Sequence, residues 1–166
     1  MRMFKNVLDL WLLLSNDENL HRLLYYQAKN LDDDPLSPDK TDILKQPDRW
    51  KITDERILRS PVTTDLTSTE ICRVCVYPGR RYPGAANDNY LVANQDIIIE
   101  IYVHMEKYDK RDFRLSKLCD YIDKTFFDKK ITGVSSMKFK GGYNITSPPK
   151  GYIGYQLVYS FGSVKG

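Results

Sequence analysis

Two cysteines, Cys72 and Cys75, form a CxxC motif and are the residues with the clearest potential for chemistry. A zinc site needs thiolate or imidazole ligands that converge on one point, usually four of them. Residues i and i+3 of a strand point to opposite faces, and a redox-active CxxC sits at a helix N-terminus. Because the surrounding sequence is strand-like, we interpret the pair as ordinary strand residues.

The other candidates for catalysis or metal binding have no partners at a recognisable spacing. His21, His104 and Cys119 are far apart in the sequence, and catalytic signatures require a nucleophile, a base and an orienting group together. Aspartates cluster in residues 32–42, but the Gly and the terminal Glu of a calcium-binding EF-hand loop are missing. We therefore expect no catalytic residue, no metal and no cofactor, and we expect that the protein is not an enzyme.

The composition favours one soluble, intracellular domain. The chain has 166 residues, of which 42% are hydrophobic, and a net charge of +3. An odd number of cysteines argues against a disulfide framework. The apolar run 7–14 is interrupted by Asp9 and is too short to span a bilayer, so we expect no membrane contact. The weak net charge argues against a protein that binds nucleic acid mainly by neutralising phosphates.

The hydrophobic pattern divides this domain, residues 1–166, into three parts. Residues 1–30 predict two helices, and residues 31–69 predict an irregular connection rich in Pro and Asp. Residues 70–166 follow the order strand, arm, strand, helix, strand, strand. The fold class that we predict is α+β, with a mainly antiparallel sheet of about four strands, one helix packed on it, N-terminal helices and the long connection.

Several boundaries and faces follow from the spacing of apolar residues. We expect the first strand to start at Glu70, the helix to open at Asp112 and the next strand to start at Val134. The expected core face of the strongest strand is Ile97, Ile99, Ile101 and Val103. The expected apolar stripe of the first helix is Phe4, Val7, Leu8, Trp11 and Leu12.

An arm from Gly79 to Asn94 separates the first two long strands. It spans about sixteen residues where most hairpin loops need two to five, and so long a loop is usually functional. The arm carries residue types that are enriched at interfaces or in tight turns, namely Arg80, Arg81, Tyr82, Asn87, Asn89 and Tyr90. We predict that this arm, 79–94, projects from the sheet and contacts another subunit or protein.

From about Glu70 to Val164, the order of elements resembles the tail terminator proteins of long-tailed bacteriophages, also called tail completion or head–tail joining proteins. The matching segments are "ICRVCVYPGRR", "DIIIEIYVHMEKYD", "DFRLSKLCDYIDKTFF", "ITGVSSMKFKGGYN" and "GYIGYQLVYSFGSV". The opening "VLDLWLLLSNDENLHRLLYY" is similar to the N-terminal helices of such proteins from phages of Gram-positive hosts. The insert 32–69 is longer than the family pattern.

The resemblance implies a structural virion protein. Such proteins form hexameric rings at the head-proximal end of the tail tube, end its polymerisation and give the head connector a docking surface. The implied partners are further copies of the chain, the tail tube protein and a head-completion or connector protein, and DNA passes through the ring without sequence-specific binding. The implied location is the virion neck or tail, after assembly in the host cytoplasm. A second interface is then expected at Trp50, Leu36 and Ile43 of the connection.

Two alternatives stay open. One is another neck component, such as a head-completion adaptor. The other is a small nucleic-acid-binding α+β module, in which basic and aromatic residues of the last two strands form a stacking platform. The residues of that platform would be Lys138, Lys140, Tyr143, Tyr152 and Tyr155. Aromatic residues on strands more often belong to a core or an interface, which favours the structural role.

Overall fold

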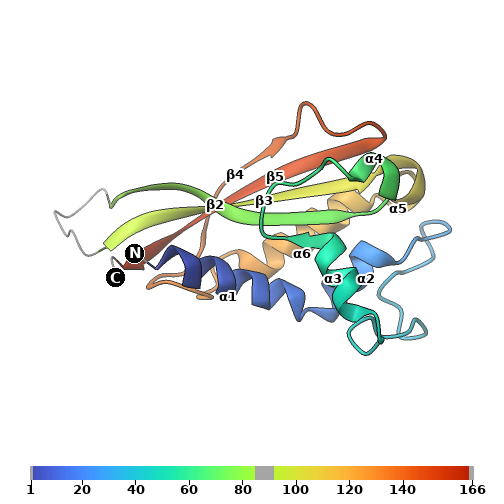
Figure 1. Cartoon of the computed structure of the whole chain (residues 1–166), viewed down its shortest axis with the longest axis horizontal. Helices are drawn as coiled ribbons and strands as arrows, with labels where there is room; N and C mark the ends of the chain where they lie inside the picture. The colour runs from blue at the N-terminus through green and yellow to red at the C-terminus, as the bar shows by residue number, and fades with distance from the viewer. Residues whose placement is uncertain (1, 85–91, 165–166) are drawn as a thin grey trace.

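A five-stranded sheet in the order β1-β2-β3-β5-β4 is the frame of the molecule (Figure 1). The computed structural model describes residues 2–84 and 92–164. The strands are β1 (Ile57–Leu58), β2 (Arg73–Pro83), β3 (Val92–His104), β4 (Lys138–Asn144) and β5 (Tyr152–Val164). The helices are α1 (Met3–Ser15), α2 (Glu18–Tyr25), α3 (Arg49–Arg56), α4 (Leu66–Thr69), the π-helix η1 (Met105–Asp109), α5 (Lys110–Asp112) and α6 (Arg114–Phe126). The predicted α+β class is confirmed, with the two-residue β1, which runs parallel to β2, as an addition.

The two longest strands, β3 and β5, pair antiparallel along their whole length, from Val92 opposite Val164 to His104 opposite Tyr152. The isoleucines and valine predicted to form the core face of β3 are fully buried, because this side of the strand lies under the helices. The start of α1 and the end of β5 lie at the same end of the molecule as the last residues of β2, whereas α2, α3 and α5 lie at the other end (Figure 1).

Helices α1, α2 and α6 cover one face of the sheet and build the main core with it (Figure 1). The predicted stripe of α1 is correct for Trp11, and for Val7 and Leu8, which pack against the core, but it is wrong for Phe4 and Leu12. Leu10, Trp11 and Leu14 point into the core, whereas Phe4 is 81% exposed and Leu12 is 41% exposed. Apolar residues extend beyond the buried side of the helix on both edges, so the sequence pattern alone does not decide where the buried stripe is centred.

A second, smaller core lies on the opposite face, at the end of the sheet near α4. It contains Leu66, Ile71, Cys75, Tyr102 and Tyr152. The hydroxyl of Tyr152 donates to the carbonyl of Leu66 at 2.6 Å and accepts from the N–H of Ile71 at 3.0 Å. The segment that includes α4 is therefore fixed across this end of the sheet.

The connection 31–69 is more regular than predicted, because it contains α3, β1 and α4. Side chains of α2 hold its first part. Arg22 donates to the carbonyls of Ser37 and Lys40 and pairs with Asp42 at 2.6 Å. Backbone groups away from water need partners, and here polar side chains provide them. The order of this segment therefore comes from tertiary contacts and has no periodic signal in the sequence.

Three predicted boundaries are wrong by a few residues. The first long strand starts at Arg73 rather than at Glu70, whose backbone is left-handed with φ 50°. Helix α6 starts at Arg114, because Phe113 is also left-handed, with φ 54°. β4 starts at Lys138 rather than at Val134, because a turn at Gly133 precedes it. The N–H of Val134 donates to the carbonyl of Gly162, but this hydrogen bond is not part of the pairing between β4 and β5.

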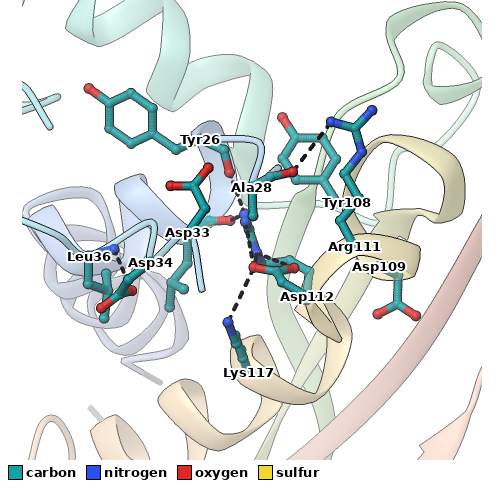
Figure 2. Close-up of polar contacts among 12 residues, drawn as sticks. Tyr26, Ala28, Asp33, Asp34, Leu36, Tyr108, Asp109, Arg111, Asp112 and Lys117 are labelled. Carbon is teal, nitrogen blue, oxygen red and sulfur yellow. Dashed lines mark hydrogen bonds and ion pairs between the residues drawn. The ribbon is translucent and has the colours of Figure 1, made fainter. Parts of the chain in front are cut away.

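A buried ion pair fixes the start of α6. The carboxylate of Asp112 pairs with Arg114, and both side chains have no exposed surface. The guanidinium of Arg114 also donates to the carbonyls of Leu23 and Tyr26, at the end of α2. Figure 2 shows Lys117 reaching the same carboxylate, at 3.3 Å. One arginine thus joins the start of α6 to the end of α2.

A second buried arginine, Arg73, gives a prediction about acid stability. Its guanidinium binds Asp65 through two bonds of 2.6 and 2.7 Å and lowers the pKa of that carboxyl in the folded state. Because the pKa of Asp65 is lower in the folded state than in the unfolded state, where it is about 4, the ionised carboxylate stabilises the fold at pH values above about 4. This contribution is lost as the pH falls through the folded-state pKa. We expect Asp65→Asn to lower stability at neutral pH and to lose less on acidification than the wild type.

Urea unfolding midpoints measured between about pH 7 and pH 2 test this prediction. Asp54→Asn is the matched control, because Asp54 is an exposed carboxylate on α3. The control is expected to follow the wild-type pH profile. An Asp65→Asn profile parallel to that of the wild type would contradict the assignment.

Candidate functional site

The small core covers one end of the second face of the sheet, as far as Tyr77 and Glu100. Past these two residues, no helix within residues 2–84 and 92–164 packs on this face. We call this surface the open face. On each of four strands, every second side chain points away from the helices and belongs to this face. These residues are Tyr77, Tyr82, Asp96, Ile98, Glu100, Tyr143, Gln156 and Val158. Ile98 and Val158 pair directly across β3 and β5 and are only half-buried. The mixture of aromatic, aliphatic and polar groups is typical of protein–protein contact surfaces.

Tyrosine hydroxyls hold the two carboxylates of the open face. Glu100 accepts from Tyr77 at 2.6 Å and from Tyr102 at 2.8 Å. Asp96 accepts from Tyr82 at 3.3 Å. Burial and the Glu100 carboxylate raise the pKa of both Tyr77 and Tyr102. The hydroxyls of Tyr77 and Tyr102 therefore remain neutral donors, and they fix the direction of the Glu100 carboxylate without cancelling its charge. Asp96 is only 7% exposed, and the ammonium group of Lys140, which donates to Tyr82, interacts with it.

The predicted arm 79–94 is shorter than expected, because strand pairing continues into it. Arg81 pairs with Gln95, Tyr82 with Asn94 and Pro83 with Ala93. Thus Arg80, Arg81 and Tyr82 belong to β2 and not to a loop. Asn87, Asn89 and Tyr90 lie outside the described residues, so the contact predicted for them stays a prediction.

A bulge between Pro78 and Arg81 sets the directions of these side chains. Arg80 is exposed, and its guanidinium lies 5.7 Å from the centre of the Tyr82 ring. Arg81 turns to the helix side and donates to Ser163 at 3.4 Å. Ser163 in turn accepts from Asn6 of α1 at 2.8 Å. Arg81 therefore anchors the hairpin within the subunit, and Arg80 and Tyr82 are the residues of this group that face outward.

Only part of the predicted second interface, which consists of Trp50, Leu36 and Ile43, is exposed. Trp50 is 54% exposed, with the guanidinium of Arg49 stacked 3.9 Å from its ring. Leu36 is half-buried against the main core. Ile43 has no exposed surface, and its N–H donates to the carboxylate of Glu18. The expectation for Ile43 is therefore wrong, and Trp50 is the exposed residue of the three.

The proposed stacking platform for nucleic acid is not assembled. Tyr143 is 58% exposed, but Tyr152 is only 2% exposed and belongs to the small core. Tyr155 packs against the main core on the opposite face of the sheet. Lys138 pairs with Asp128 at 3.1 Å, and Lys140 donates to Tyr82. The three tyrosines therefore do not form one exposed surface.

The histidines have structural surroundings. His21 is 1% exposed, with one ring nitrogen 2.8 Å from the hydroxyl of Thr53. Burial lowers the pKa of His21. His104 accepts from the N–H of Lys107 and lies edge-on to Tyr152. No group of three or more potential metal ligands occurs within the described ranges. Among the described helices, none is both long and apolar enough to cross a membrane.

The two cysteines of the CxxC motif lie on opposite faces of the sheet, as predicted. Cys75 belongs to β2, and Cys72 directly precedes this strand. Cys72 belongs to the main core and Cys75 to the small core. Burial raises the pKa of Cys72, Cys75 and Cys119 to about 12. Because the thiolate is the reactive form, we expect all three to react with a thiol reagent at about pH 8 far more slowly in the native protein than in denaturant. Rapid labelling of the native protein would contradict this assignment.

The fold and the open face define a small α+β protein with its three main helices, α1, α2 and α6, on one side of a mainly antiparallel sheet. The family described as YomW matches residues 17–161. The chain is also 32% identical over 160 residues, 92% of each protein, to "SPbeta prophage-derived uncharacterized protein YomW" of Bacillus subtilis (strain 168). The chain belongs to the YomW family. This relationship indicates a protein of phage origin.

Proposed function

We propose that this protein is a structural, non-enzymatic component of the phage neck. In this proposal it forms a ring, expected to be a hexamer, at the head-proximal end of the tail tube. The ring ends tube polymerisation and joins the tail to the head connector. Its partners are further copies of itself, the tube protein and a head-completion or connector protein. DNA passes through the ring without sequence-specific binding, and the protein resides in the virion after assembly in the host cytoplasm.

The observation that carries the proposal is a prophage-derived relative that aligns with 92% of the chain. The likeness of residues 70–164 to tail terminators is informative because the protein is phage-derived. The element order that carries this likeness is present as β2, β3, α6, β4 and β5. Likeness of order alone would remain an analogy, because one fold can serve many functions.

The surfaces of the protein also support an assembly role. The open face, the exposed Trp50 and the outward pair Arg80 and Tyr82 are of the residue types that are enriched at interfaces. Ring subunits contact each other through two different surfaces, which close when the rotation between copies is right. A subunit with exposed contact residues on several sides suits that arrangement.

The oligomeric state of the purified protein tests the ring directly. We expect native mass spectrometry and negative-stain images to show closed rings, either in solution or after addition of purified tail tubes. Binding to the portal or connector without binding to tubes would favour the head-completion adaptor. Salt-dependent binding to single-stranded DNA, with no assembly on tubes, would favour the nucleic-acid module and contradict the proposal.

A further inference from the structure

His21 is a buried histidine at the contact between two short helices. It belongs to α2 and is only 1% exposed. One ring nitrogen, Nδ1, lies 2.7 Å from the backbone carbonyl oxygen of Asp17, and the other, Nε2, lies 2.8 Å from the hydroxyl of Thr53 on α3. Thr53 has no exposed surface. A titratable ring on α2 is therefore joined to a side chain of α3 inside the protein.

The two partners of the ring determine where its proton lies. A carbonyl oxygen can only accept a hydrogen bond, so Nδ1, which faces Asp17, carries a proton in both the neutral and the charged ring. In the neutral ring, Nε2 accepts from the hydroxyl of Thr53. In the charged ring, Nε2 donates to that hydroxyl, whose own proton then turns to the carbonyl of Arg49, 3.1 Å away. The contact therefore has two hydrogen-bond arrangements that differ by one proton.

The surroundings of the ring favour its neutral form. Burial is the largest influence, and it lowers the pKa of His21 below its usual value. Arg49 on α3 acts in the same direction, whereas Asp17 and Glu18 of the first turn of α2 act against it. Both carboxylates already have other partners. Asp17 accepts from the hydroxyl of Tyr121 on α6, and Glu18 forms an ion pair within α2.

Helix α3 depends on its contacts with the helices beneath it. It has eight residues, and an isolated helix of fewer than about 12 residues is at best marginally stable in water. At its start, Arg49 donates to the carbonyl of Ser15, and at its end, Arg56 donates to the carbonyl of Leu24. Thr53, with its bond to the histidine, lies between these two links. Weakening of this bond therefore acts on the middle of α3.

We propose that His21 and Thr53 form an acid-sensitive joint between α2 and α3, which is closed while the ring is neutral and loosens when the ring takes up a proton. Because both residues are inside the protein, a charged ring regains water only when α3 moves away from α2. Helix α3 also carries the exposed Trp50, so any contact that Trp50 makes with another protein weakens as the joint loosens. The inference goes beyond the proposed function and does not depend on it.

The pH at which the joint loosens follows from the lowered pKa of His21. When the joint is open and the ring is in water, the histidine titrates near its unperturbed pKa of about 6.5. Well above this pH, the ring is neutral in the closed and the open state, and the joint has its full stability. As the pH falls below about 6.5, the open state takes up the proton first, so the closed state loses stability until the pH reaches the folded-state pKa.

Nuclear magnetic resonance of the intact protein, labelled with ¹⁵N at histidine, tests the arrangement without a substitution. We expect the neutral ring of His21 to carry its proton on Nδ1 and its titration midpoint to lie below about pH 6.5. The chain has two histidines, so the spectrum of His21→Gln, which retains His104, assigns the signals. A neutral ring with its proton on Nε2, or a midpoint at or above about pH 6.5, would overturn the inference.

Hydrogen exchange at about pH 7.5 and about pH 5.5, corrected for the intrinsic effect of pH, tests the loosening. We expect the protection of the α3 amides to fall by about three- to tenfold at the lower pH, while that of α6 changes little. The fall should persist in His104→Gln, the matched control, and disappear in His21→Gln. Thr53→Val should already reduce the protection of α3 at the higher pH, whereas Thr53→Ser, which keeps the hydroxyl, should resemble the wild type. Protection of α3 that is equal at both pH values in the wild type, or a fall that persists in His21→Gln, would overturn the inference.

Discussion

Replacement of Arg114 by Met is expected to lower the free energy of unfolding by about 3–5 kcal/mol. Arg114 and Asp112 have no exposed side-chain surface, and they are joined by hydrogen bonds of 2.9 to 3.2 Å. Loss of the guanidinium leaves the carboxylate of Asp112 buried without its main partner. It also leaves the carbonyls of Leu23 and Tyr26 without the donor that they share. The expected loss is large because each of these groups has already been removed from water.

Chemical denaturation of the purified variants measures this loss. The matched control is Lys117→Met, which removes the other cation that touches Asp112. Because Lys117 is 38% exposed, its loss is expected to cost less than about 1 kcal/mol. Asp112→Leu combined with Arg114→Met is expected to recover part of the stability, because no buried charge then lacks a partner. An Arg114→Met variant as stable as the wild type would contradict the role of this ion pair.

A second large effect is expected for Gly133→Ala, which should destabilise the fold by about 2–5 kcal/mol. Gly133 has φ +71°, and a Cβ there would lie 2.2 Å from the carbonyl oxygen of Gly162 and 2.7 Å from the ring of Phe161. A left-handed conformation costs about 1–2 kcal/mol for other residues, and forced packing costs a further 1–3 kcal/mol. The same carbonyl of Gly162 accepts the N–H of Val134, so relief of the clash would also strain that bond.

Gly84→Ala is the control for this substitution, because a Cβ at Gly84 would meet no atom of residues 2–84 or 92–164 within 4 Å. We expect a change in stability within about 0.5 kcal/mol for this variant. Both variants are compared by urea denaturation under the same conditions. Equal stability of the two would contradict the close approach of the turn at Gly133 to β5.

The elements with strong apolar periodicity could be predicted from the sequence, and the others could not. β3 alternates without interruption, so its predicted core face is correct, and the apolar residues of α6 recur at spacings of three and four, as its packing on the core requires. β2 appeared to end at Gly79 because Pro78 and Pro83 are typical of loops. Both prolines lie on a strand whose outer edge is free beyond Cys75, and a proline without an N–H is tolerated at such an edge.

The candidate surface depends on information that a single sequence does not contain. The alternation of β3 placed Glu100 on the side away from the core. Its contact with Tyr77 follows from the register of β2 and β3, which the misjudged arm obscured. The exposure of Phe4 and Leu12 was also not predicted, because apolar residues extend beyond the buried side of α1 on both edges. The burial of Ile43 comes from tertiary contacts of Glu18, more than twenty residues earlier.

The most direct test of the proposed neck role is to remove this protein from the phage that encodes it and to examine the products of infection by electron microscopy. The account predicts filled heads and separate tails, with tail tubes of abnormal length and a loss of infectious particles. Expression of the intact chain from a plasmid should restore joined particles of normal tail length. Normal tails joined to heads, with an unchanged yield of infectious phage, would contradict the account.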